Sequence, residues 1–422
     1  VDQVTDPIEG ENLIHLVEVQ EILAEDQALL EYHVGDQAVF SFAVTPKDMG
    51  FFKTKIPDNG LLKGFFATFS EEEVRSLTEQ AIQQYDSVAQ SLYTGLMARP
   101  MKLISSDLTS QLIIVPDKQL SYIPFELLTE ERQSEANSFT ELSYLIKKFE
   151  ITYAYSSNAY FTVGESKVSY EGKLLAFAPD YSNIVNDTSL LASMGSVRAG
   201  FSELPFNGDE VSGISQYFDS RILQDSLAIV DKFREERNGY DVFHLAMHAL
   251  VDERDPEQSK LVFASGRDAK EDIFLHSYEI YSMRLPAQLT VLSACNTGGG
   301  RLIEGEGIMS LARAFAYAGS RSVIMSHWNV DDQATSTLMS KLYEKLATGE
   351  TKGAALREAK LTYLESASPN KQHPFFWGAF VMIGDNEPVE VSNNTSVFWV
   401  ISVGVFLLLM SLLVLRQRKR QS

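Results

Sequence analysis

From Lys173 onward the sequence alternates short apolar segments with segments of helical periodicity. Apolar strands that alternate with helices are typical of a mainly parallel sheet covered by helices. In such sheets the functional crevice lies beyond the carboxyl ends of the strands. The pattern therefore predicts an α/β fold, with strands at 174–178, 241–247, 289–294, 322–325 and 376–383 and helices at 210–218, 307–317, 331–346 and 352–364.

Two reactive side chains follow neighbouring strands of this pattern. His248 comes directly after the strand 241–247, and Cys295 comes after the strand 289–294 and shortly before a run of glycines. Taken alone, a cysteine after an apolar strand is more often a small core residue. Together, an imidazole and a thiol can serve as base and nucleophile, and glycines let backbone N–H groups approach an oxyanion. We interpret His248 and Cys295 as a candidate catalytic dyad.

A zinc site is the competing interpretation of His244 and His248. That site would need both histidines on one helical face and further ligands, but the segment is a predicted strand. Cys295 is the only cysteine of the chain, which excludes a cysteine-rich metal site and an intrachain disulfide. We therefore expect no metal and no cofactor, and we give His244 a structural role.

Several segments, taken in order, resemble the CHAT family of caspase-like cysteine peptidases, which is related to separase and usually follows TPR repeats. The segments are LIIVPDKQLSYIPFELL (112–128), HLAMHA (244–249), LSACNTGGG (292–300), GIMSLARAFAYAGSRSVIMSHWNVDD (307–332) and HPFFWGAFVMIGD (373–385). Because separate motifs occur in the right order, the resemblance is more specific than any one of them. It implies a caspase-like thiol protease, a hydrolase, with a protein or peptide substrate.

The resemblance also implies roles for single residues. Cys295 would be the nucleophile, and His248 would act as base and then as acid. The backbone N–H groups of Ala249 and Cys295 would form the oxyanion hole. Asp332 would line a pocket that binds Arg or Lys before the scissile bond. Two positions depart from the family: Asn296 replaces a frequent Glu, and Ala249 replaces the usual Gly, which would strain the backbone if the site needs a positive φ.

Asp332 also has a simpler interpretation. It stands at the start of the predicted helix 331–346, where the helix dipole favours a carboxylate. In that case Asp331 is the expected cap, and neither residue needs to contact a substrate. The sequence leaves both interpretations of Asp332 open.

The N-terminal part has its own pattern. A β-hairpin is predicted around Gly35-Asp36, a helix from Ser70 with Glu73 in a capping box, and a buried strand at 112–115. We predict an α+β part at 1–170, a catalytic part at 171–386 and a polar linker at 387–396. The chain begins with Val1 rather than Met, so we expect an upstream part, which the resemblance suggests is a TPR-like sensor region.

The segment 397–415 is apolar and carries no charge. Nineteen helical residues span about 28 Å, which matches the hydrocarbon core of a bilayer. Trp399 lies near one end, and a basic tail at 416–422 follows. We predict a single C-terminal transmembrane helix. The basic tail prefers the cytoplasm, but the side on which the body lies depends on upstream signals and stays open.

The net charge of the chain argues against nucleic-acid binding. With 57 acidic and 36 basic residues the net charge is −21, and nucleic-acid binding needs a basic face. The sequence thus predicts a membrane-anchored cysteine endopeptidase that cleaves after a basic residue. A catalytically silent scaffold or signalling adaptor with the same fold is the alternative. An esterase or acyltransferase that uses the same dyad is a third hypothesis, because acyl chemistry does not reveal the leaving group.

Overall fold

The computed structural model describes residues 13–70, 74, 78–104, 108–162, 170–185, 202–252, 254–265, 272–294, 300–303, 307–329 and 331–391. Cys295, Asn296 and the predicted membrane segment 397–415 lie outside the described residues. Within the described ranges, no helix is both long and apolar enough to cross a bilayer.

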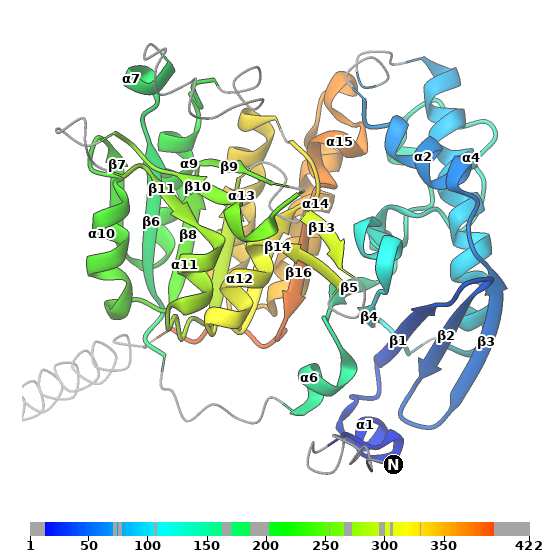
Figure 1. Ribbon diagram of the computed structural model, residues 1–422. Coiled ribbons are helices and arrows are strands. Elements are labelled where there is room, and N and C mark those ends of the chain that lie inside the picture. The colour runs from blue at the N-terminus through cyan, green and yellow to red at the C-terminus, as the bar shows by residue number, and fades with distance from the viewer. Residues whose placement is uncertain are drawn as a thin grey trace, which may run out of the picture.

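An eleven-stranded sheet runs through the whole molecule, in the order β3-β2-β1-β4-β5-β16-β15-β12-β8-β6-β7 (Figure 1). In its C-terminal half all neighbouring strands pair in parallel except β15 and β16. Except for the edge strand β7, these strands are buried on both faces, which explains their nearly continuous apolar sequences and confirms the α/β prediction. Their bounds are β6 (Lys173–Pro179), β7 (Asp219–Asp225), β8 (Val242–Ala246), β12 (Leu289–Ser293), β15 (Ser322–Ser326) and β16 (Phe380–Gly384).

Helices cover both faces of this half. Successive side chains of a strand point to opposite faces, so Phe243 of β8 packs on Phe233 while His244 meets Glu210. The first face carries α10 (Val230–Glu236), α11 (Ser277–Ser282) and α12 (Leu311–Ala318) (Figure 1). The second face carries α9 (Asn207–Ile214), α13 (Asp332–Ala347) and α14 (Lys352–Ser366).

The N-terminal half continues the same sheet. The predicted hairpin is confirmed as antiparallel β1 (Gln27–Val34) and β2 (Ala38–Val44), and the predicted strand 112–115 is β4 (Gln111–Val115). Ile383 of β16 pairs with Tyr153 of β5, which joins the two halves. The boundary near residue 170 stays a prediction. The other elements are β3 (Met49–Lys55), β5 (Glu150–Tyr153), α1 (Leu16–Ile22), α2 (Asn59–Ala67), α4 (Glu79–Leu96), α5 (Ala98–Ile104), α6 (Ser157–Thr162) and α7 (Ser182–Val185).

Two predicted boundaries were wrong, and a third falls partly outside the described residues. Of residues 71–77 only Val74 is described; it is helical, and its N–H donates to the Ser70 carbonyl (2.9 Å). Helix α4 begins at Glu79, because Thr78 caps it by accepting a hydrogen bond from the Ala81 N–H. Of the predicted helix 307–317, the first residues form strand β14 (Gly307–Ser310), which pairs with β13 (Gly300–Ile303), and Ser310 then caps α12. Of the predicted strand 376–383, the first residues belong to α15 (Pro374–Trp377), whose first residue is a proline with a fixed φ.

The strand that leads to His248 ends slightly earlier than predicted. Strand β8 stops at Ala246, and the chain then enters β9 (His248–Leu250) of a second sheet. That sheet has the order β11-β10-β9, with β10 at Lys260–Val262 and β11 at Phe274–His276. His248 thus lies where the chain leaves the large sheet for the small one.

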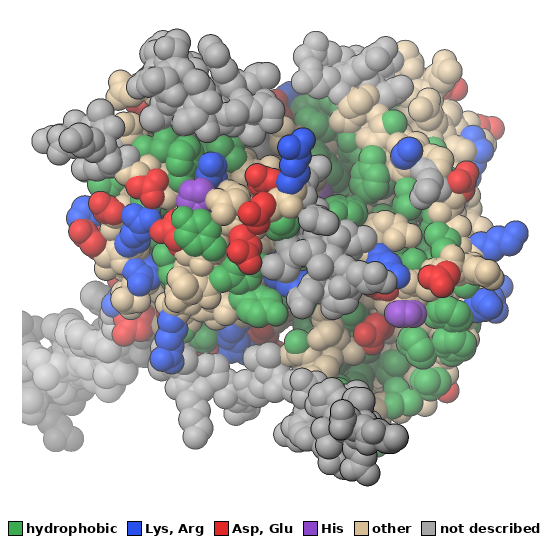
Figure 2. Space-filling view, in the orientation of Figure 1, with side chains coloured by type: hydrophobic (Ala, Val, Ile, Leu, Met, Phe, Trp, Pro, Cys, Tyr) green, Lys and Arg blue, Asp and Glu red, His purple; other side chains and the backbone are tan. Residues whose placement is uncertain are grey.

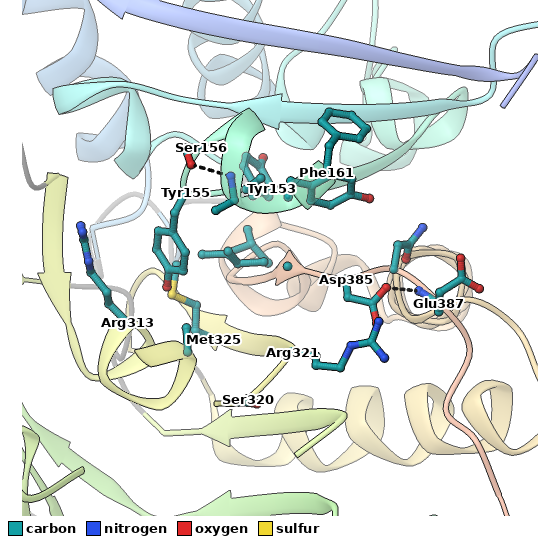
Figure 3. Close-up of a pocket in the computed structure, with 18 of the residues that line it drawn as sticks. Tyr153, Tyr155, Ser156, Phe161, Arg313, Ser320, Arg321, Met325, Asp385 and Glu387 are labelled. Atoms are coloured by element: carbon teal, nitrogen blue, oxygen red, sulfur yellow. Dashed lines mark hydrogen bonds and ion pairs between the residues drawn. The ribbon is translucent and has the colours of Figure 1, made fainter. Parts of the chain in front are cut away.

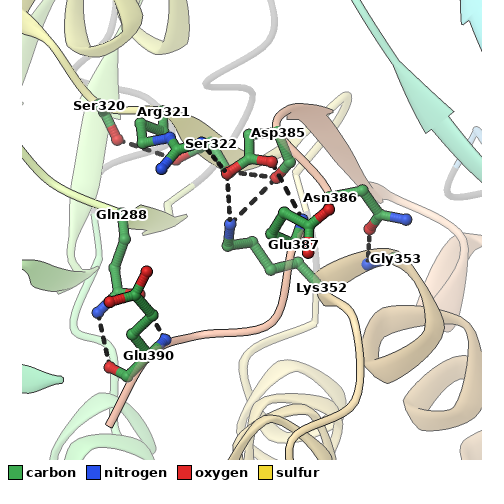
Figure 4. A network of polar contacts seen from close by, with 10 residues as sticks. All are labelled: Gln288, Ser320, Arg321, Ser322, Lys352, Gly353, Asp385, Asn386, Glu387 and Glu390. Atoms are coloured by element: carbon green, nitrogen blue, oxygen red, sulfur yellow. Dashed lines mark hydrogen bonds and ion pairs between the residues drawn. The ribbon is translucent and has the colours of Figure 1, made fainter. Parts of the chain in front are cut away.

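After β16, residues 385–391 form a strap along the edge of the sheet where β12 and β15 begin (Figure 4). Asp385 pairs with Arg321 (3.1 Å) and with the buried Lys352 (3.3 Å). The Glu390 N–H donates to Gln288 Oε1 (2.7 Å), and the Glu390 carbonyl accepts from Gln288 Nε2 (2.9 Å). The strap therefore fastens the chain to the edge opposite to His248.

The surface shown in Figure 2 carries interspersed acidic and basic side chains. Exposed hydrophobic side chains gather on β2 and on the edge strand β3, where Phe42, Met49 and Phe51 are more than a third exposed. On this face the acidic side chains are therefore mixed with basic ones.

Candidate functional site

The strands that precede His248 and Cys295 are neighbours in the sheet. Ala246 of β8 and Ser293 of β12 are register partners in a parallel pair. Each stands two residues before its candidate catalytic residue, and neighbouring strands lie about 4.8 Å apart. The two chains therefore leave the sheet side by side at one edge. The distance between the imidazole and the thiol stays a prediction, because Cys295 lies outside the described residues.

His248 is buried, with 8 % of its surface exposed. Its Nε2 lies 2.7 Å from the Ser202 carbonyl oxygen, and because a carbonyl only accepts, Nε2 must be the donor. In the neutral ring Nδ1 then carries the lone pair, so Nδ1 is the nitrogen that can act as a base. Burial lowers the pKa of His248, and the Ser202 carbonyl acts in the opposite direction. The ring is therefore set to be neutral at pH 7.

Tyr181 holds the backbone of His248. Its hydroxyl accepts a hydrogen bond from the His248 N–H (3.0 Å) and donates one to the Val262 carbonyl (2.6 Å). The Tyr181 ring packs against the imidazole, with 4.8 Å between the ring centres. The sequence analysis missed both Tyr181 and Ser202. Every residue has a backbone carbonyl, so the sequence does not distinguish Ser202. Tyr181 follows strand β6 and belongs to no recognisable motif.

Ala249 lies in strand β9 opposite Leu261. Among the non-glycine residues that the structure describes, only Lys118 and Asp225 have a positive φ. The strain expected for an alanine at position 249 under a positive φ therefore does not arise. The part of Ala249 in an oxyanion hole stays a prediction.

Asp331, not Asp332, caps helix α13. Asp331 Oδ1 accepts from the Ala334 N–H (2.9 Å), and Oδ2 pairs with Lys371 (2.8 Å). Asp332 Oδ2 instead accepts from the Phe206 N–H (2.7 Å), just before α9. Burial raises the pKa of Asp332, and the Phe206 N–H lowers it. Asp332 is thus a half-buried carboxylate that serves no capping function.

Asp332 lines a small cavity of about 20 Å³. The cavity lies at the carboxyl ends of β8 and β12, so Asp332 stands at the same edge of the sheet as His248. A space of this size holds about one water molecule and no basic side chain. The other lining residues are Leu204, Asn207, Glu210, Ala246, Met247, Ser293, Ala294 and Thr335.

His244 is fully buried in the middle of β8. Its Nε2 lies 2.8 Å from Glu210 Oε1, and its Nδ1 lies 3.1 Å from the Tyr343 hydroxyl. Both ring nitrogens are thus paired inside the core, which agrees with a structural role. Within the described ranges, no group of three or more His, Cys, Asp or Glu residues could hold a metal ion.

A much larger groove, of about 1810 Å³, lies between the two halves of the molecule. Tyr155 and Phe161 line it from the N-terminal half, and Arg313, Met325 and Asp385 line it from the C-terminal half (Figure 3). None of the predicted site residues that the structure describes lines this groove. We place the candidate site at the His248 edge, because the imidazole and the buried carboxylate are there.

Comparisons with known proteins identify the family of the chain. A family model described as "CHAT domain" matches residues 86–385. Tetratricopeptide repeat protein 28 of Homo sapiens is 24 % identical over 325 residues, which cover 68 % of this chain and 12 % of that protein. The same protein of Mus musculus matches over the same shares. The chain thus spans about an eighth of the length of these curated relatives.

Two solved structures are similar in fold. The Saccharomyces cerevisiae separase–securin complex matches with a TM-score of 0.51 and 11 % identity, over 86 % of this chain and 30 % of that one. The Arg-specific cysteine proteinase gingipain R matches with a TM-score of 0.42 and 14 % identity, over 75 % of this chain and 70 % of that one. The first likeness supports the fold, and the second is too weak to support a conclusion.

Proposed function

Because the chain belongs to the CHAT-domain family and has an α/β caspase-like fold, we propose that it is a cysteine endopeptidase with a His248–Cys295 dyad. One observation carries the proposal: the pairing of Ala246 with Ser293 brings the strand ends before the two residues side by side. The buried, neutral imidazole supplies the base that a thiol nucleophile requires.

The chemistry follows from the tautomer of His248. Its Nδ1 takes the thiol proton, and the Cys295 sulfur attacks the carbonyl carbon of the scissile bond. The oxyanion that forms accepts hydrogen bonds from the N–H groups of Ala249 and Cys295. The imidazolium then gives its proton to the leaving amine, and water hydrolyses the thioester with His248 again as base. The Ser202 carbonyl stabilises the imidazolium in both steps.

The carboxylate of Asp332 would select a basic residue before the scissile bond. It lies half-buried at the same edge as His248. A cationic side chain that enters the cavity would compensate for the desolvation of the carboxylate.

Two parts of the proposal extend beyond the folded body. We propose that segment 397–415 anchors the protein in a membrane, on the basis of its uncharged sequence and the basic tail after it. We also propose control by an upstream repeat region, because the curated relatives are named tetratricopeptide repeat proteins.

A scaffold or adaptor without catalysis is the second candidate. It is favoured by the volume of the cavity beside Asp332, which is too small for a substrate side chain in this conformation. The two candidates differ in a measurable way, because only the peptidase needs Cys295 for its effect.

The test compares cleavage of matched Arg and Leu peptides by the wild type and by Cys295→Ala, Asp332→Ala and Asp331→Ala. We expect no cleavage by Cys295→Ala. We expect Asp332→Ala to lower the Arg-to-Leu ratio of kcat/KM by roughly 10²–10³-fold, since a substrate cation is then buried without a partner. Asp331→Ala, which removes the neighbouring cap, should cost about 1 kcal/mol of stability and leave that ratio unchanged. Cleavage by Cys295→Ala, or an unchanged ratio in Asp332→Ala, would contradict the proposal.

A further inference from the structure

His248 is the first residue of β9, and its register partner in β10 is Val262. Along an antiparallel strand, successive residues direct their backbone groups to opposite neighbours. The Phe263 N–H donates to the Ile273 carbonyl (2.8 Å), which lies just before β11. Phe263 therefore faces β11, and the backbone groups of Val262, the residue before it, face β9. The His248 N–H and the Val262 carbonyl thus face each other across the two strands.

The Tyr181 hydroxyl bonds to both groups of this facing pair. It accepts from the His248 N–H (3.0 Å) and donates to the Val262 carbonyl (2.6 Å). A ladder does not require such a bridge, because an N–H and a carbonyl that face each other can bond directly at about 2.9 Å. The hydroxyl therefore enters the ladder at the residue that carries the candidate base.

Tyr181 reaches this pair from a fixed position. It follows β6, a neighbour of β8 in the large sheet, and it is 1 % exposed. Asp180 accepts from the Ser182 N–H (2.9 Å) and from the Ser182 hydroxyl (2.7 Å), and the Tyr181 carbonyl accepts from the Ile184 N–H (2.9 Å). The backbone on both sides of Tyr181 is thus held, and its ring packs against the imidazole of His248.

We infer that Tyr181 is a positioning residue, whose hydroxyl sets the spacing of β9 and β10 at His248 and thereby the position of the imidazole. This inference rests on the proposed function and deepens it. Without the hydroxyl, the His248 N–H and the Val262 carbonyl close on each other, and His248 moves toward β10. A displacement on the order of 1 Å in a reacting group can lower the rate about 100-fold.

The same displacement would reach Ala249. This residue follows His248, so its backbone groups face the other side of β9, away from β10. Its N–H is the donor that we propose for the oxyanion hole. Because the two residues are adjacent in one short strand, the base and the oxyanion donor move together. The Tyr181 hydroxyl therefore aligns both groups with the substrate.

The first experiment measures peptide cleavage by Tyr181→Phe, which keeps the ring against the imidazole and removes only the hydroxyl. We expect kcat to fall about 100-fold with KM unchanged, because the change displaces the reacting groups and not the residues that bind substrate. We expect the Tm to stay within about 3 °C of the wild-type value, because the two facing backbone groups can then pair directly.

Tyr85→Phe is the matched control. Tyr85 is also buried, and its hydroxyl donates to a backbone carbonyl, that of Leu127 (2.9 Å), in the N-terminal half. We expect this variant to lower the Tm and to leave kcat unchanged. A wild-type kcat in Tyr181→Phe would overturn the inference. So would a Tyr181→Phe protein that fails to fold or loses more Tm than Tyr85→Phe, because the backbone pair would then not have closed.

Alkylation separates this inference from the proposed function. Cys295 is the only cysteine, so iodoacetamide reports on that thiol alone. We expect the wild type to react with a pH midpoint below the ordinary thiol value of about 8.5, and the midpoints of Tyr181→Phe and His248→Ala to move toward that value. This result in a wild type that cleaves no peptide would support the positioning role and contradict the peptidase. Identical profiles for the wild type and Tyr181→Phe would overturn the inference even if the wild type cleaves peptides.

Discussion

His373 shows how one buried side chain makes stability depend on pH. It is 2 % exposed, and its Nδ1 accepts a hydrogen bond from the Phe375 N–H (3.0 Å). The rings of Phe69, Tyr85 and Phe139 pack around it, with ring centres 4.7 to 5.9 Å away. Burial lowers the pKa of His373 to about 3. The folded protein therefore holds this imidazole neutral well below pH 6.5.

The expected consequence is acid sensitivity. Between about pH 3 and pH 6.5 the unfolded chain binds a proton at His373 that the folded protein does not bind. The free energy of unfolding therefore falls as the pH falls through this range, by roughly 1.4 kcal/mol per pH unit for one group. His373→Gln, which keeps an acceptor for the Phe375 N–H, should reduce the slope of unfolding free energy against pH between 4 and 6. Denaturant titrations with identical slopes for both proteins would contradict this account.

At the residue scale, the sequence predicted the groups that have chemical signatures. His248 and Asp332 were singled out, and the structure places both at one edge of the sheet. Ser202 could not be predicted, because its carbonyl reaches His248 only through the fold of the chain between β6 and α9. Glu210 was visible only as an acid in the first turn of a helix, where the dipole explains it equally well.

At the element scale, a buried ion pair fastens three segments together. Lys360 of α14 lies 2.8 Å from Glu126, in the short 3₁₀ helix Phe125–Leu127. The Tyr153 hydroxyl of β5 donates to the same carboxylate and accepts from the Phe125 N–H. Both charged side chains are almost completely buried. The pair holds the N-terminal half against the helix that covers the middle of the sheet.

Removing one partner should therefore be costly. Lys360→Met leaves the Glu126 carboxylate buried without its cation, and we expect a loss of about 3–5 kcal/mol in the free energy of unfolding. Lys341→Met, which breaks the exposed pair of Lys341 and Glu344, should cost at most about 1 kcal/mol. Chemical denaturation of the two variants measures the difference. A loss for Lys360→Met as small as that for Lys341→Met would show that the buried pair contributes little.

Elements were predicted best where burial is complete. Strands β6, β8, β12 and β15 were predicted to within about two residues at each end, because strands buried on both faces have short apolar sequences. The edge strand β7, which is parallel to β6 but largely polar, was not predicted. Helix starts were less certain, because capping signals recur. The sequence analysis placed a start at Ser70 and did not identify Thr78, whose side chain caps α4. Strand β14 was not predicted, because its sequence also fits the first turn of the helix that follows it.

At the scale of the whole molecule, the main surprise is the continuity of the sheet. The contact between β5 and β16 joins residues more than two hundred positions apart. No local pattern contains that pairing, so the sequence predicted a smaller α+β part and a catalytic part without indicating how they join. The structure places both halves on one sheet.

The membrane anchor is also tested at this scale. We expect deletion of residues 397–422 to release the protein from membranes into the soluble fraction. The deletion begins after the described strap, so it removes none of the contacts described above. Sedimentation of the shortened protein with membranes would contradict the proposed anchor. Circular dichroism of the shortened protein controls for loss of the fold.

The strap also determines how the molecule bears mechanical load. A pulling force on the chain beyond residue 391 would act first on the two hydrogen bonds between Gln288 and Glu390. The ion pairs of Asp385 with Arg321 and Lys352 resist next, before the force reaches β16. All these contacts lie at the edge where β12 and β15 begin. Tension at the tail is therefore applied first at the end of the sheet opposite to His248.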